Sequence, residues 1–230
     1  MVHLMMILLF AAPPQPAVEV KAAAASMAPD VKALVDRVQA FYEKTNDFTA
    51  DFKQDYTYKA FKRTQSSSGK VTFAKPGMMR WDYLKPSART FVLAREQVVA
   101  LDPEAMTLTI MSMATSQLSA SVTFLWGKGK LADDFSIAMK ECKTCTGMLL
   151  EMTPLRPDPR FQRVLLEVDP KSATVLKSTV IDPDGSENVI SFGAMQLNTG
   201  IDATKFKLEP TAGIQVIDYT KMKPAAPTPP

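Results

Sequence analysis

Histidine is nearly absent from this sequence, and its absence excludes a large group of functions. The only histidine among the 230 residues is His3. A chain without a later histidine cannot use Ser-His or Cys-His nucleophilic chemistry, and it lacks the commonest zinc ligand. Its carboxylates form no recognisable acid–base pair, and its glycines form no phosphate-binding pattern. We therefore predict that the protein is not an enzyme, holds no metal and uses no cofactor.

Concentrated positive charge is also missing. The formal net charge is +3, and no block of Lys and Arg residues stands out. A protein that binds nucleic acid would be expected to present a basic face, so nucleic acid is not an expected partner. The apolar share of 46% is enough for a sizeable core. The length allows one or two domains, and β-barrels of this size are commonly single domains.

Cysteine is scarce, and the two that occur are close together. Cys142 and Cys145 form a single C-x-x-C pair. One pair cannot complete a four-ligand zinc site without a second pair or a histidine. Redox C-x-x-C motifs usually open a helix after a strand, whereas this pair lies between two apparent strands beside Gly147. A local disulfide in a hairpin turn is the expectation for an oxidising compartment, with a free thiol pair as the alternative.

Long hydrophobic runs are absent as well. The apolar run from Leu4 to Ala12 is too short to cross a bilayer. It fits the core of a signal peptide, with the small residues Ala22 to Ala25 as a cleavage region. We assign residues 1–25 to this signal and expect the protein to be exported. No cysteine follows the run directly, so lipid attachment to the protein itself is not expected.

The chain after the predicted signal begins with one amphipathic helix and a long strand. Pro29 can occupy the first turn of the helix, and Asn46-Asp47 should end it. From Phe48 to Tyr58 apolar and polar residues alternate, which indicates a half-buried strand. The serine-rich stretch 62–69 is then expected to be a loop. The apolar stripe of the helix consists of Val31, Leu34, Val35, Val38, Phe41 and Tyr42.

Short strands at regular spacing follow, which is typical of a β-sandwich or β-barrel. No alternation of strands and helices appears, so the sheet should be antiparallel. The turn sequence Asp182-Pro183-Asp184-Gly185 separates two of these strands. The predicted strands are 70–74, 79–84, 90–94, 97–101, 107–111, 147–152, 163–168, 175–181, 188–192, 206–208 and 214–217.

The insert 116–138 interrupts the strands with a helical pattern. Leu118, Val122, Leu125 and Trp126 fall at i, i+4, i+7 and i+8, and glycines at 127 and 129 close the helix. Leu131, Phe135 and Ile137 continue the apolar contacts. Such a helix can plug the core or act as a lid over an open end. Residues 221–230 form a proline-rich tail that should be disordered and to which we assign no function.

The stretch from Lys75 to Pro86 has the clearest pattern in the chain. Pro76-Gly77 makes a turn, after which Met79, Trp81 and Tyr83 point to one face of a strand. Ten of the 14 methionines lie beyond residue 30, and methionine is common on adaptable binding surfaces. These features fit a plain core or the lining of a binding cavity, and composition alone favours the core.

The order and spacing of two motifs resemble the LolA family of periplasmic lipoprotein carriers. Lys75-Pro76-Gly77-x-x-Arg80-Trp81-x-Tyr83 is preceded by Phe48-x-Ala50-x-Phe52-x-Gln54, and the similarity runs from about residue 31 to about residue 218. The resemblance implies a mainly β fold over residues 28–220, a half-open antiparallel β-barrel with an N-terminal helix and a helical lid. It also implies a chaperone that binds the acyl chains of lipoproteins and carries them from the inner to the outer membrane.

Partners and site residues follow from the same resemblance. The implied partners are acylated lipoproteins, an inner-membrane lipoprotein-releasing ABC transporter and an outer-membrane lipoprotein acceptor, with the protein acting as a monomer. Lys75 stands where the family usually has an arginine that holds the lid through helix carbonyls, and lysine lacks the planar fork of arginine. The implied lipid-binding residues are Phe48, Phe52, Phe73, Met79, Trp81, Tyr83, Phe91, Leu118, Val122, Leu125 and Met152.

Two further points qualify this resemblance. The family has an Asp-Gly turn where this chain has Ala94-Arg95, and an aromatic residue where it has Val99. The alternative function is an RseB-like lipid-sensing or regulatory domain on the same fold. Such a protein would need an additional domain that binds its partner, for which this chain is expected to be too short.

Overall fold

A computed structural model describes residues 27–112 and 130–221 of the chain. Helix α1 (Pro29–Lys44) begins this part as predicted, with Pro29 in its first turn. Asp30 near its start and Lys44 near its end have the charges that the helix dipole favours. Its buried side chains recur at helical spacing, so the amphipathic pattern sets which side of the helix packs; they are Val31, Leu34, Val35, Val38 and Tyr42.

The strands of the described residues form one sheet. They are β1 (Asp47–Tyr58), β2 (Arg63–Ala74), β3 (Met78–Lys85), β4 (Arg89–Ala94), β5 (Gln97–Asp102), β6 (Thr107–Ser112), β7 (Phe135–Lys140), β8 (Met148–Pro154), β9 (Arg163–Val168), β10 (Val175–Ile181), β11 (Glu187–Phe192), β12 (Gln196–Leu197) and β13 (Gln215–Asp218). Their order is β13-β6-β5-β4-β3-β2-β1-β11-β10-β9-β8-β7, and β12 pairs with the start of β1.

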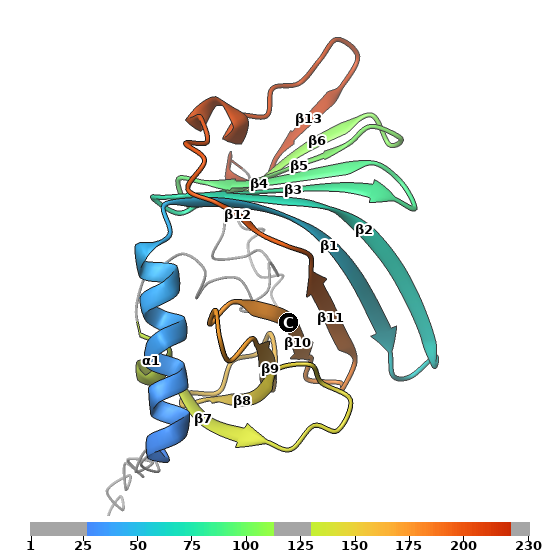
Figure 1. Cartoon of the computed structure of the whole chain (residues 1–230). Coiled ribbons are helices and arrows are strands. Elements are labelled where there is room, and N and C mark those ends of the chain that lie inside the picture. Colours follow the sequence, from blue (N-terminus) through green and yellow to red (C-terminus); the bar gives the residue numbers. More distant parts are fainter. Residues whose placement is uncertain (1–26, 113–129, 222–230) are drawn as a thin grey trace, which may run out of the picture.

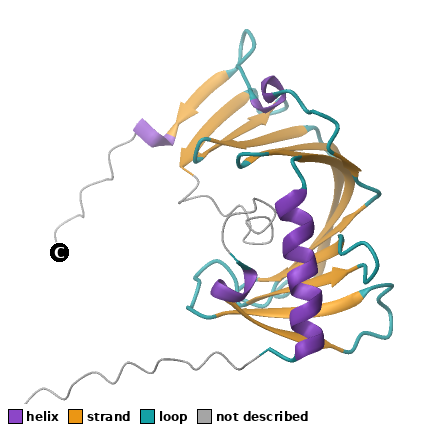
Figure 2. Cartoon of the chain, turned by 60° about the vertical axis from the view of Figure 1, so that its left-hand side comes forward, coloured by secondary structure: helices purple, strands orange, loops and turns teal. Residues whose placement is uncertain are grey.

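The sheet curls without closing. β7 and β13 stand at the two ends of the strand order and do not pair with each other in the described part of the chain. Figures 1 and 2 show the sheet bending around the side on which α1 lies. Neighbouring strands are antiparallel except β13, which runs parallel to β6. The predicted half-open antiparallel barrel with an N-terminal helix is thus confirmed.

The core lies between α1 and the face of the sheet turned toward it, which we call the inner face. Buried side chains from α1, from β1–β4 and from β8–β10 belong to one continuous apolar cluster. A smaller cluster on the outer face joins Val92 of β4 to Phe206. Phe206 lies in a short 3-10 helix, η3 (Ala203–Phe206); a second, η4 (Tyr219–Lys221), ends the described chain. The inner face is therefore the place to look for the predicted site.

The serine-rich stretch 62–69 is a strand and not the predicted loop. β2 begins at Arg63 and pairs with β1 as far as Tyr58. Ser66 Oγ donates a hydrogen bond of 2.5 Å to Asp55 across the pair, so polar cross-strand contacts replace the apolar alternation that signals a strand. Gly69 is required here, because a Cβ atom would lie 1.9 Å from the carbonyl oxygen of Asp82.

Two other predicted elements are corrected, and several fall outside the described residues. The helical insert was expected to reach residue 138, but its last part is the short helix α3 (Leu131–Asp134) followed by β7. Residues 206–208 do not form a strand, because Phe206 ends η3 and packs on the outer face. The predicted signal 1–25, the helix with Leu118, Val122 and Leu125, and the tail beyond Lys221 lie outside the described residues.

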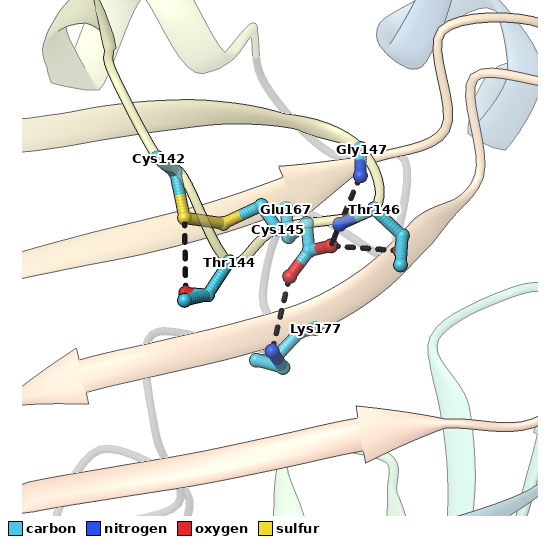
Figure 3. Close-up of polar contacts among 7 residues, drawn as sticks. All are labelled: Cys142, Thr144, Cys145, Thr146, Gly147, Glu167 and Lys177. Atoms are coloured by element: carbon cyan, nitrogen blue, oxygen red, sulfur yellow. Dashed lines mark hydrogen bonds and ion pairs between the residues drawn. A yellow bond between two sulfur atoms is a disulfide. The ribbon is translucent and has the colours of Figure 1, made fainter.

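A buried carboxylate fixes the turn between β7 and β8 (Figure 3). Glu167 of β9 accepts hydrogen bonds from the backbone N–H groups of Thr146, at 2.7 Å, and Gly147, at 3.0 Å. Lys177 Nζ lies 3.0 Å from its other oxygen. Burial by itself would raise the pKa of Glu167, but the Lys177 ammonium and these N–H donors outweigh it and lower the pKa to about 2.

Glu167 should make folding stability depend on pH in the acid range. Its pKa in the folded state lies below the ordinary value of 4.5, so its contribution is present above about pH 4.5 and is lost as the pH falls toward 2. Glu167→Gln should lower the free energy of unfolding by about 1–3 kcal/mol at neutral pH and flatten the acid decline. Urea unfolding at several pH values measures both effects.

The matched control is Asp51→Asn. Asp51 also has a lysine partner, with Lys70 Nζ at 2.8 Å, but its side chain is 79% exposed. Exposed ion pairs contribute little to stability, so this variant should unfold like the wild type at every pH. Equal acid declines in the wild type and Glu167→Gln would contradict the role given to Glu167.

Candidate functional site

The inner face brings the predicted lipid-binding residues of the described chain together. They come from β1, β2, β3, β4 and β8, strands separated by up to about a hundred positions in sequence. Met79 is completely buried, and Trp81 is 3% exposed. Tyr83 and Phe91 are partly buried and pack against the same cluster. The residues brought together are Phe48, Phe52, Phe73, Met79, Trp81, Tyr83, Phe91 and Met152, while Leu118, Val122 and Leu125 lie outside the described residues.

Aromatic rings form a connected chain along this face. Phe52 lies at the centre, with ring centroids 4.9 Å from Trp81 and 5.0 Å from Tyr83 in edge-on contacts. Tyr83 continues to Phe91 at 5.6 Å, and Trp81 continues to Phe192 at 6.4 Å. Such edge-on contacts stabilise a packed aromatic group beyond the burial of its surface. The chain of rings crosses from β4 to β11 and so joins the two halves of the sheet.

Trp81 brings a polar group, its indole N–H, into this apolar interior. Its indole N–H is buried and has no hydrogen-bond partner among the described residues. A buried donor without an acceptor costs about 1–3 kcal/mol, which a phenylalanine at this position would avoid.

The interior becomes polar at the end of the strands remote from α1. Tyr83 donates its hydroxyl to Gln54 at 2.8 Å, and Gln54 donates its side-chain amide to Asn188 at 2.8 Å. Burial raises the pKa of Tyr83 to about 12, so its hydroxyl keeps its proton at neutral pH. A hollow of about 200 Å³ opens beside this group, lined by Gln54, Tyr56, Gln65, Ser67, Tyr83, Lys85, Pro86, Ser87, Arg89 and Phe91.

Sequence reasoning missed three residues of this site. Phe192 follows Ile190 at strand spacing on β11, and this alternation was the signal that could have found it. Gln54 is the next inner-face residue of β1 after Phe52. Because it is polar, it breaks the apolar alternation and was not recognised as part of the site. Tyr56 lines the hollow and donates to Asp182 at 2.5 Å, a contact that only the pairing of β1 with β11 creates.

Neither a metal site nor a membrane-spanning helix is found in the described residues. No group of three or more His, Cys, Asp and Glu side chains among them is arranged to hold an ion. No helix in this part has the length and apolar character needed to cross a bilayer. A larger groove of about 890 Å³ lies on the outer face between β3–β5 and residues 203–209, away from the predicted residues.

Comparison with known proteins identifies the family. The family model described as outer membrane lipoprotein carrier protein LolA matches residues 43–209. The chain belongs to the LolA family. It is 27% identical over 184 residues to the outer-membrane lipoprotein carrier protein of Dechloromonas aromatica, covering 80% of this chain and 86% of that protein. The corresponding Pseudomonas aeruginosa (strain UCBPP-PA14) protein is 27% identical over 189 residues, covering 82% and 89%.

Solved structures support the fold. An uncharacterized conserved protein from Thermus thermophilus superposes with a TM-score of 0.54 at 14% identity, covering 82% of this chain and 99% of that one. At this identity the likeness concerns the fold alone. The family is one of carrier proteins, which agrees with the prediction that the chain is not an enzyme.

Lys75, the residue implied by LolA resemblance as a latch, contacts a helix carbonyl in the structure. Its Nζ donates to the backbone oxygen of Glu43 at 2.6 Å, near the C-terminal end of α1. A cation at this position also meets the negative end of the helix dipole. The backbone N–H of Lys75 donates to Asn46 at 2.8 Å. The described contacts of Lys75 therefore join the β2–β3 turn to α1, and its role toward a lid stays a prediction.

The turn between β4 and β5 lies one residue further along than the pair Ala94-Arg95 that the resemblance implied, because Ala94 still belongs to β4 and pairs with Gln97. Arg95 and Glu96 occupy it, and both have positive φ angles, 52° and 62°. Positive φ is unfavourable for residues with a Cβ atom, and glycine adopts it at less cost. The turn is therefore a tight hairpin in which two residues with side chains adopt the positive φ angles that glycine would adopt at lower energy.

Cys142 and Cys145 form a disulfide in the turn between β7 and β8 (Figure 3). The turn lies between two strands, as the sequence predicted, and no helix begins at the pair. Both cysteines are half-buried, and the neighbouring Thr146 and Gly147 donate their N–H groups to Glu167. The disulfide and the buried carboxylate thus hold the same turn from its two sides.

The purified protein should contain this disulfide. Mass spectrometry without reductant should show two hydrogens fewer than the sequence mass, with no cysteine open to alkylation. Cys142→Ser/Cys145→Ser should melt only slightly below the wild type, because a disulfide that closes a very short loop removes little entropy from the unfolded chain. Acyl binding should be unchanged, and free thiols together with lost binding in the double variant would contradict a purely structural disulfide.

Proposed function

We propose that this protein binds the acyl chains of lipoproteins in its apolar interior and carries them across the periplasm, from the inner to the outer membrane. One observation supports this above others. Aromatic and methionine side chains from five separate strands converge on one continuous interior, and a hollow leads away from its end. Membership of the LolA family and the names of its relatives agree with lipoprotein cargo.

The chemistry of the interior fits acyl chains. A saturated chain offers no hydrogen bonds, so it is best enclosed by apolar groups that ask for none. Met79 and Met152 supply flexible, polarisable surface that can adapt to different chains. The N–H of Trp81, which has no partner among the described residues, would find its acceptor in the ester or amide carbonyl at the head of an acyl chain.

Reversible transfer limits how completely the chains can be buried. At ~0.8 kcal/mol for each methylene, enclosing ~45 methylenes of three chains would contribute roughly 36 kcal/mol. This exceeds the ~20 kcal/mol ceiling of noncovalent affinity. A carrier that releases its cargo must therefore leave part of the chains exposed or spend free energy on opening its interior.

Opening is required because the described interior is packed. Met79, Phe48 and Phe73 have no exposed surface, so cargo must separate α1 and the facing strands or enter from the hollow. Loading at an inner-membrane ABC transporter and release to an outer-membrane acceptor would supply the two occasions for this movement. The protein would act as a monomer between them.

Met79→Glu separates a cargo site from a plain core. In a core that never opens, the buried carboxylate costs several kcal/mol and unfolds a domain of ordinary stability. In an interior that opens to water, the carboxylate reaches solvent, so melting should fall modestly while binding of a fluorescent fatty acyl probe is lost. Both quantities are measured on the same sample.

The control is Val92→Glu, which buries a carboxylate in the outer cluster. It should destabilise the protein while each folded molecule still binds the probe. Loss of folding and binding together in Met79→Glu would indicate plain core. Normal binding by a normally folded Met79→Glu would remove Met79 from the site.

Lys75→Leu tests the latch. The hydrogen bond to Glu43 is exposed, so its loss should lower the melting temperature only slightly. If Lys75 holds the closed form, the variant should bind lipoprotein but hand it to acceptor membranes more slowly than the wild type. Lys75→Arg keeps the donor and should transfer normally. Wild-type transfer by Lys75→Leu would show that the residue only anchors α1.

A further inference from the structure

Exposed apolar side chains lie on three separate hairpins at one end of the sheet. Phe61 is 79% exposed and Leu84 is 65% exposed, more than any other large apolar residue of the described chain. Met106 is 52% exposed. The three lie at three different hairpins, between β1 and β2, between β3 and β4, and between β5 and β6. Folding does not use these side chains, because none of them belongs to either apolar cluster.

The strand register places these hairpins at the same end. Lys85 at the end of β3 pairs with Ser68, and the β1–β2 ladder continues from there to Tyr58 and Arg63. The next two turns lie side by side, because Thr90 at the start of β4 pairs with Leu101 near the end of β5. Figure 1 shows the three turns along one side of the molecule, away from α1. We call residues 58–63, 84–89 and 102–107 the hairpin rim.

Positive charge surrounds two of the three apolar tips. The hairpin rim contains five cations and two carboxylates; the cations are Lys59, Lys62, Arg63, Lys85 and Arg89, and the carboxylates are Asp102 and Glu104. Arg89 lies 3.8 Å from Asp102, and Lys59 lies beside the next turn of the sheet, at Gly185. Lys62, Arg63 and Lys85 form no ion pair with any described residue, so their charges face the solvent.

One turn of the rim, residues 84–89, also lines the hollow at the end of the interior. Lys85 and Arg89 of the rim line it together with the inner-face residues Tyr56, Tyr83 and Phe91. A surface that met this turn would thus lie next to the hollow. The apolar interior, the polar hollow and the apolar and basic tips thus follow one another toward the same end of the sheet.

We propose that the hairpin rim docks the protein on a lipid bilayer that carries anionic headgroups. Apolar side chains on separate projecting turns can insert among headgroups one by one, and flanking lysine and arginine side chains pair with lipid phosphates. The net charge of the rim complements such a surface. A protein partner would instead be expected to fit a continuous apolar patch, which these separated tips do not form. Docking would point the hollow at the bilayer.

Vesicle co-sedimentation of the purified protein tests this inference. The protein should bind vesicles of phosphatidylcholine with about one third phosphatidylglycerol, and bind pure phosphatidylcholine vesicles much less. Raising the salt concentration should weaken the binding, because exposed charges are screened. Failure to bind the anionic vesicles would overturn the proposal, and so would equal binding to both kinds of vesicle.

Variants of the rim locate the binding surface. Phe61→Ser/Leu84→Ser/Met106→Ser should reduce partitioning about tenfold or more, since three inserted side chains are removed. The matched control is Leu197→Ser/Tyr219→Ser, which removes apolar side chains 37% and 53% exposed that lie off the rim. It should bind vesicles like the wild type. All five positions are exposed, so the variants should melt normally.

The outcomes separate this inference from the proposed carrier function. If the rim variant still bound the acyl probe but no longer bound vesicles, both proposals would be supported. If the rim variant and the control bound vesicles equally well, the rim would not be the docking surface, whatever the acyl-binding result. Loss of probe binding in Met79→Glu bears only on the interior.

Discussion

The pairing of β1 with β11 is the interaction on which the rest of the structure depends. Strands β2–β6 extend from one side of β1, and β11–β7 extend from the other. In the described residues this pairing is the one ladder that connects the two halves of the curved order. Phe52 lies opposite Phe192, and Gln54 opposite Ile190. The apolar faces of the two halves therefore point to the same side of the sheet, and α1 can pack against both halves.

This connection gives the interior two different ends. At one end the β2–β3 turn meets the C-terminal end of α1 through Lys75 and the carbonyl of Glu43. At the other, the apolar run stops at the polar group of Tyr83, Gln54 and Asn188, and the hollow begins. The interior is therefore anchored to α1 at one end and bordered by a polar hollow at the other. Asn188 of β11 joins this polar group from the other half of the sheet through its bond with Gln54.

Local patterns predicted most elements because they were built from short-range constraints. α1 followed from the stripe Val31 to Tyr42 and from Pro29, and the strands 163–168 and 175–181 have the predicted bounds. The errors share a cause. Strand 63–69 is held by hydrogen bonds to its partner and by the close approach at Gly69, so its own composition resembled a loop. The apolar side chain of Phe206 was interpreted as part of a strand, but it packs in the outer cluster from a 3-10 helix.

The sequence by itself determined which side chains could form the site, and the tertiary structure decided where they meet. Alternation put Met79, Trp81 and Tyr83 on one face, since side chains on a strand alternate between faces. It could not show that Phe192, 140 positions after Phe52, completes the same group of rings, because that contact depends on strand order. Nor could it show that Phe61, Leu84 and Met106 share one end of the sheet, because register between distant hairpins is set by pairing.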